Sequence, residues 1–196
     1  LSAYPDFGKR LFYVTRENGM DIVNNNSSKV NIQKSTGYSQ TDLLQKIIFR
    51  PNENTEHLVN IQLSNSSAYN RYDRLTETAA NGMPSFAEWY YGPQVRNMVG
   101  YKLSKTNLKG YFQELALNTN YQHLEESRIS RRFNSNNKDF RFEKVDIFGV
   151  NADFLHKDKY GELHFGVESY YNIVNSFLIK FNFTIKGFFF IVHIHI

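Results

Sequence analysis

The sequence predicts an all-β chain whose strands form an antiparallel up-and-down meander. The first observation behind this prediction is that apolar and polar residues alternate with a period of two over long stretches, which is typical of half-buried strands. The second is composition: 16% of the 196 residues are aromatic, and 22 Asn residues stand against four Pro, which suits strands joined by polar turns. The third is that the connections between the candidate strands alternate between short and long.

The first expected element is a β-hairpin near the N-terminus. Asn18-Gly19 separates two apolar-rich segments, residues 11–14 and 20–23. Asn-Gly is the preferred pair for a two-residue hairpin turn, because both residues tolerate positive φ. After this hairpin the period-two pattern predicts six main strands, at about residues 39–50, 58–66, 93–104, 110–125, 140–155 and 162–174.

Each strand has one polar and one apolar set of residues. In the second strand, Val59, Ile61 and Leu63 alternate with polar residues, and in the sixth strand Phe165 and Val167 do the same. We expect the polar residues of all these strands to share one wet face: Asn60, Gln62, Ser64, Arg96, Lys102, Asn118, Asn120, Gln122, Asn151, Asp153, His164 and Glu168.

The lengths of the connections favour a membrane protein. The connections at 51–57, 104–109 and 156–161 are short, whereas those at 65–92 and 126–139 are long. Outer-membrane barrels have short turns at one end and long loops at the other, and 9–11 tilted residues suffice to cross a bilayer. The pattern therefore predicts a transmembrane β-barrel. A soluble antiparallel sheet with one wet face is the alternative.

Several segments resemble the barrel of TonB-dependent outer-membrane receptors, in particular the iron/haem-type receptors of Bacteroidetes-like bacteria. The resemblance spans roughly residues 35–175 and is strongest at 71–76, RYDRLT, and at 87–96, AEWYYGPQVR. It also covers YSQTDLLQK at 38–46 and EKVDIFGVN at 143–151.

The resemblance implies a 22-stranded barrel filled by an N-terminal plug. Residues 1–176 would then be a partial barrel, and the chain a fragment. The full-length form would import iron chelates (siderophores) or haem across the cell outer membrane, driven by TonB through the missing plug and box region. The expected partners are outer-membrane lipid, TonB and a small anionic iron chelate or haem. Import of cobalamin or a glycan by the same machinery, and a soluble β-sheet module that binds a ligand or carbohydrate, are the alternatives.

The candidate ligand-binding residues combine Arg with aromatic side chains in the two long connections. Aromatic rings supply contact area, and Arg can form two parallel hydrogen bonds to a carboxylate. There are three alternatives. Tyr72, Asp73 and Arg74 would lock the base of the first loop, and 89–91 would belong to an aromatic girdle. In the second connection, Arg128, Arg131 and Arg132 would pair locally with Glu125 and Glu126. The candidates are Tyr69, Arg71, Tyr72, Arg74, Trp89, Tyr90, Tyr91, Arg131 and Arg132.

The sequence gives no reason to expect an enzyme, a cofactor, a metal site or a nucleic-acid partner. There is no Cys, no phosphate-binding Gly-rich loop, no nucleophile elbow and no Lys/Arg cluster within the net charge of +4. His193 and His195 alternate near the end of the chain without a third ligand nearby. Residues 177–196 form an atypical apolar tail, and the hypothesis for it is non-native sequence translated out of frame.

Overall fold

The protein is all-β and antiparallel, as predicted. A computed structural model describes residues 12–25, 37–182 and 190–195. Within these ranges one small sheet pairs β1 (Phe12–Glu17) with β2 (Met20–Asn25), and the other strands form one nine-stranded sheet. None of the described helices is long and apolar enough to cross a membrane.

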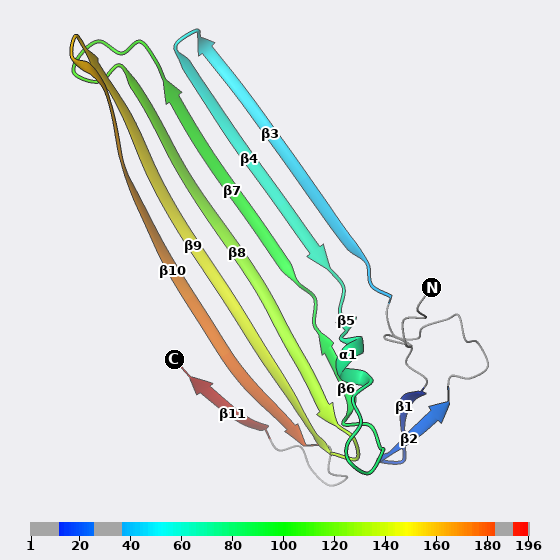
Figure 1. Ribbon diagram of the computed structural model, residues 1–196. Coiled ribbons are helices and arrows are strands. Elements are labelled where there is room, and N and C mark those ends of the chain that lie inside the picture. The colour runs from blue at the N-terminus through cyan, green and yellow to red at the C-terminus, as the bar shows by residue number, and fades with distance from the viewer. Residues whose placement is uncertain (1–11, 26–36, 183–189, 196) are drawn as a thin grey trace, which may run out of the picture.

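The large sheet is a single-layered meander in which each main strand is antiparallel to its neighbours (Figure 1). Its strands follow one another across the sheet in the order of the chain, with two additional short strands at one end. The main strands are β3 (Gln40–Asn52), β4 (Thr55–Ser66), β7 (Val95–Lys105), β8 (Glu114–Arg132), β9 (Asn137–Asp158), β10 (Gly161–Asn182) and β11 (Phe190–His195).

The six predicted main strands are confirmed, but two of their connections differ from the prediction. The long connection expected over 126–139 is wrong, because β8 continues to Arg132 and β9 begins at Asn137, which leaves a four-residue turn. The many Glu and Arg residues of 125–132 conceal the alternation of apolar and polar residues there. The strand is nevertheless regular, since Ile129 lies opposite Phe140 and is buried. The connection after β7 is longer than expected and runs over 106–113.

The predicted N-terminal hairpin is also confirmed for its described residues; Leu11 lies outside them. Asn18 and Gly19 have φ values of 49° and 80°, the positive values that a two-residue turn of this kind requires. The turn places Arg16 opposite Asp21 on neighbouring strands.

The long connection between β4 and β7 contains its own short elements: β5 (Tyr69–Asn70), α1 (Tyr72–Leu75) and β6 (Phe86–Tyr91). β6 pairs with residues 128–132 of β8 and β7 pairs with residues 115–125, so both run along the same neighbour. The interruption between them contains Gly92, where an added Cβ would lie 2.0 Å from Ser127 Oγ. Glycine therefore allows the chain to stay close to β8 at this point.

The register confirms that the twelve predicted polar residues share one face of the sheet. Residues directly opposite each other on neighbouring strands point to the same side. Lys102 lies opposite Asn118, Asn118 opposite Asn151, and Asn151 opposite Glu168, and the period of two places the others on this side. We call this side the polar face and the other the apolar face.

The apolar face is exposed to a degree that is unusual for water-soluble domains. Among the described residues only five apolar side chains are buried: Leu75, Pro84, Ala87, Ile129 and Leu155. In contrast, thirteen large apolar side chains on the apolar face are 36–65% exposed: Leu43, Ile47, Phe49, Leu63, Val99, Tyr121, Phe148, Val150, Leu163, Phe165, Val167, Tyr171 and Ile173.

The start of the atypical tail is continuous with the sheet. Residues 177–182 complete β10 and pair in register with residues 137–142, and β11 pairs with residues 176–181. Residues 183–189 and 196 lie outside the described part of the chain. The non-native origin of the tail remains a hypothesis.

Candidate functional site at the loop end of the sheet

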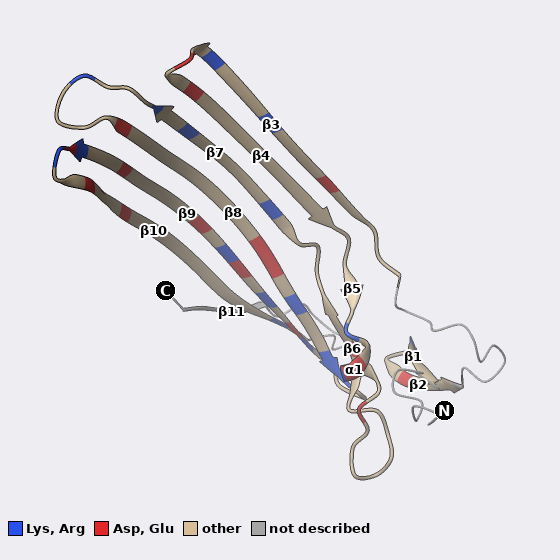
Figure 2. Ribbon diagram, turned by 45° about the horizontal axis from the view of Figure 1, so that its top comes forward, with Lys and Arg blue, Asp and Glu red and all other residues tan. Residues whose placement is uncertain are grey.

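All nine predicted site residues lie at one end of the sheet, where β1, β2, β5, α1, β6 and the turn between β8 and β9 gather (Figure 1). We call this the loop end. Lys and Arg are concentrated there at the end of β8, beside α1 and β6 (Figure 2). Tyr69 is in β5, Arg71 immediately precedes α1, Tyr72 and Arg74 are in α1, residues 89–91 are in β6, and Arg131 and Arg132 end β8.

Tyr69 of β5 and Trp89 and Tyr91 of β6 form a packed aromatic cluster together with Arg71. The ring of Tyr91 lies 5.2 Å from that of Tyr69 and 5.2 Å from that of Trp89. Arg71 lies 5.0 Å above the Trp89 ring, and its Nε donates to Asp73 at 3.0 Å. These contacts favour the interpretation that Arg71 locks the base of the loop. Arg74 is likewise paired, with Glu77 at 2.6 Å.

The three consecutive aromatic residues of β6 do not share a face. Trp89 lies opposite Ser130 and Tyr91 opposite Arg128, so both belong to the polar face. Tyr90 lies on the other side, with the Lys138 ammonium 5.2 Å from its ring centroid. Of the three, only Trp89 and Tyr91 can therefore contact a ligand on the polar face.

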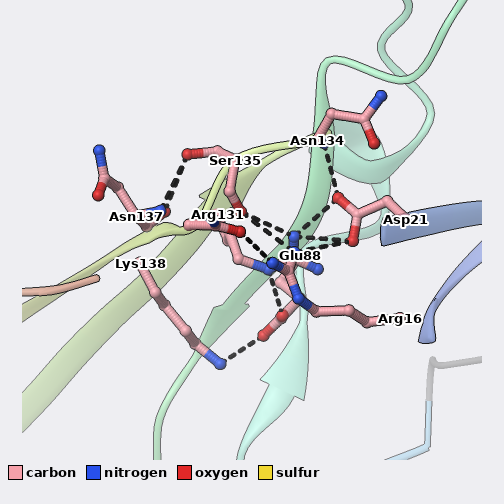
Figure 3. Close-up of polar contacts among 9 residues, drawn as sticks. Arg16, Asp21, Glu88, Arg131, Asn134, Ser135, Asn137 and Lys138 are labelled. Carbon is pink, nitrogen blue, oxygen red and sulfur yellow. Dashed lines mark hydrogen bonds and ion pairs between the residues drawn. The ribbon is translucent and has the colours of Figure 1, made fainter. Parts of the chain in front are cut away.

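Arg131 is the centre of a buried ionic cluster that joins the N-terminal hairpin to the sheet (Figure 3). Its Nη1 donates to Asp21 at 2.7 Å and its Nε donates to Glu88 at 2.7 Å. Lys138 also binds Glu88, and the backbone N–H of Asn134 donates to Asp21 at 2.7 Å. The Arg131 and Asp21 side chains are only 2% and 0% exposed.

The cluster keeps its carboxylates charged. Burial raises the pKa of Asp21, but hydrogen bonds from Arg131 and from the Asn134 N–H, with the charges of Arg131 and Arg16, bring the pKa below its usual range. Burial also raises the pKa of Glu88, and the hydrogen bonds from Lys138 and Arg131 outweigh this effect and lower it.

The position of Arg131 corrects two expectations. Its guanidinium is buried and bound by two carboxylates, so the structure gives it a structural role instead of the expected ligand contact. The expected local pairing with Glu125 and Glu126 is also wrong: Arg128 pairs with Glu143, and Glu125 pairs with Lys144. The physical reason is that the segment is a strand, whose partners come from neighbouring strands.

A cavity of about 450 Å³ opens on the polar face at the loop end. Of the predicted residues, Trp89 and Arg132 line it, and the Arg132 guanidinium lies 5.7 Å from the ring centroid of Phe86. Four cations and one carboxylate surround this cavity. Its lining consists of Phe86, Trp89, Arg128, Ser130, Arg132, Ser135, Asn137, Asp139, Arg141 and Lys180.

Two cations of the cavity, Arg141 and Lys180, were not predicted from the sequence. Both occupy polar-face positions, since Arg141 lies opposite Arg128 and Lys180 lies opposite Asp139. Continuing the period-two pattern to both ends of β9 and β10 would have found them. Arg141 lies within the predicted strand 140–155, but it was missed because its neighbour across the sheet, Arg128, was assigned to a loop over 126–139. Lys180 was missed because the tail was set aside.

Among the described residues, no group of three or more His, Asp or Glu side chains could hold a metal ion. Comparison with known proteins finds no matching family model, no matching curated protein and no matching solved structure.

Proposed function

We propose that the chain forms part of the barrel wall of a TonB-dependent outer-membrane receptor, whose full-length form imports an iron chelate or haem. The single observation that carries this proposal is the exposed apolar face of the sheet. Water-soluble monomers rarely expose contiguous apolar patches larger than a few hundred Å². Here the exposed apolar side chains extend across six neighbouring strands, from β3 to β10.

The dimensions of this face fit a lipid bilayer. On β10 the apolar positions run from Leu163 to Ile173, which matches the 9–11 residues that a tilted strand needs to cross a membrane. Two pairs of aromatic rings lie on either side of the central part of the apolar face. One pair joins Tyr121 of β8 to Phe148 of β9 at 4.9 Å, and the other joins Phe154 of β9 to Phe165 of β10 at 5.2 Å. At a rise of ~3.3 Å per residue, they are about 20 Å apart along β9. Aromatic residues at both boundaries are typical of membrane barrels.

The other face supports the same interpretation. Polar side chains line it along the strands, as a water-filled lumen requires. The cationic cavity lies on this face at the loop end, where a barrel of this kind would first meet an anionic chelate. The resemblance of residues 35–175 to TonB-dependent receptors supports the choice of this receptor class among membrane barrels.

Adjacent cysteine substitutions test the proposal, and the absence of native Cys makes labelling specific. Val167 and Glu168 are neighbours in β10 on opposite faces, and both are exposed. In lipid vesicles, we expect a membrane-impermeant maleimide to label Glu168→Cys and to leave Val167→Cys unlabelled, because lipid covers only the apolar face. Equal labelling of both variants, with the chain recovered in the buffer fraction, would refute the proposal and favour the soluble binding module.

A further inference from the structure

The cavity at the loop end has an excess of positive charge, because four cations line it against the single carboxylate of Asp139. Arg128 shares its charge with Glu143, whose Oε1 lies 3.0 Å from Arg128 Nη2. Within residues 12–25, 37–182 and 190–195, Arg132, Arg141 and Lys180 form no ion pair with a carboxylate. Cations held together in a recess raise the local concentration of anions and lower the free energy of an anion bound there.

The strand register adds a second, independent observation. Arg128 and Arg141 lie directly opposite each other on β8 and β9, both on the polar face. Like charges directly opposite destabilise a sheet. Glu143 offsets part of this repulsion at Arg128, and an anion between the two guanidinium groups would offset the rest.

The remaining lining narrows the chemistry of the ligand. A volume of about 450 Å³ suits a small molecule. Arg presents a planar fork that matches carboxylate and phosphate, and Trp89 and Phe86 offer flat surfaces beside these forks. None of the described lining residues is His, so the cavity offers no imidazole to a haem iron. A neutral ligand would leave three cations without partners.

From these observations we infer that the cavity binds a small polyanion with at least two carboxylate or phosphate groups. This inference rests on the proposed function, because it names the class of ligand that the receptor would bind at the loop end. Arg128 and Arg141 hold one anionic group between them, and Lys180 and Arg132 hold a second. Trp89 covers the carbon framework of the ligand.

Trp89 provides the readout, because it is the one Trp in the sequence. The full chain in lipid vesicles is titrated with citrate, with pyrophosphate and with neutral glucose while the intrinsic fluorescence is recorded. We expect a saturable change with citrate or pyrophosphate and none with glucose. The anion with the higher affinity shows whether the cavity prefers carboxylate or phosphate groups.

Two variants and a matched control complete the test. Arg141→Gln and Lys180→Gln should each weaken anion binding at least tenfold, whereas Lys102→Gln, on the same face but outside the cavity, should leave it unchanged. Arg141→Gln should not impair folding, because it removes a like-charge pair. No saturable response to either anion, a response to glucose, or equal binding by all variants would overturn the inference.

The proposed function and this inference fail separately. Protection of Val167→Cys in the same vesicles without anion binding would refute only the ligand class. Saturable anion binding by a chain that labels equally at Val167→Cys and Glu168→Cys would refute only the membrane proposal.

Discussion

The loop end and the remaining length of the strands, drawn above it in Figure 1, are two parts of one molecule that differ in how far their apolar side chains are exposed to solvent. The loop end buries apolar side chains, including Leu75, Ala87 and Ile129, and a charged cluster around Arg131. Along the strands above it, the apolar face remains exposed. Contacts within the chain therefore cover the apolar side chains of the loop end, whereas nothing in the described part of the chain covers the apolar face along the strands.

β8 passes through both regions and shows that the alternation itself does not differ between them. Tyr121 and Ile129 point to the same face of the sheet, yet Tyr121 is 38% exposed and Ile129 only 5%. Ile129 lies where β6 and the hairpin of β1 and β2 gather, and Tyr121 lies above them. The difference between the regions thus comes from what covers the sheet and not from the pattern of its strands.

The largest expected effect comes from Arg131→Ala, which should open the loop end without unfolding the strands above it. The substitution leaves Asp21 buried without its main cation, a change that costs about 3–5 kcal/mol. Amide hydrogen exchange should accelerate in β1, β2 and the turn between β8 and β9, and remain slow around Tyr121. The double variant Asp21→Leu/Arg131→Met is the control, since it removes both charges together. Equal acceleration throughout β8 would show that the two regions are not separable.

A charge on the apolar face should have the next largest effect. Val167→Arg should destabilise the chain in vesicles by about 2–4 kcal/mol, the cost of a cation facing the middle of a bilayer. Glu168→Arg is the matched control on the polar face and should change the free energy of unfolding much less. Denaturant titration in vesicles measures both. If Val167→Arg is as stable as Glu168→Arg, lipid does not cover this face.

Gly92 lies where the two regions join, and its substitution should have a moderate effect. A Cβ added at Gly92 would overlap Ser127 Oγ, so Gly92→Ala should cost about 1–3 kcal/mol through overpacking. Ser127→Gly removes the overlapping atom and should restore most of the loss in the double variant. A double-mutant cycle of unfolding free energies measures this coupling. If the two effects are additive, the contact with Ser127 is not the reason why position 92 requires glycine.

The smallest effect, absent near neutral pH, is the acid sensitivity of the loop end. Because the pKa of Asp21 is lowered from 3.8 in the folded state, its stabilisation is complete above this value and is lost as the pH falls through the folded-state pKa. Hydrogen exchange at Asn134, corrected for intrinsic rates, should report a constant opening free energy down to about pH 4 and a decrease below it. Asp21→Asn should reduce this decrease and leave the part that comes from Glu88, whose pKa is also lowered. A loss that begins near pH 6 would point to a different group.

Strand positions and faces could be predicted because they depend on neighbouring residues in the sequence. The pair Asn18-Gly19 determines its own turn, and alternation along 58–66 or 162–174 determines which side chains share a face. The site was predicted less completely. Trp89 and Arg132 were found as an aromatic residue and a cation in apparent loops, whereas Arg141 and Lys180 were missed, because their relevance depends on the strands beside them.

By itself, the sequence determined an antiparallel meander with one polar and one apolar face, since a period of two is a local property of each strand. The tertiary structure decided which charges meet. Arg131 binds Asp21, 110 residues away, and is thereby removed from the ligand-accessible surface, while Arg128, Arg141 and Lys180 come together around one cavity. These contacts depend on strand order and register, which are set by the packing of the whole sheet.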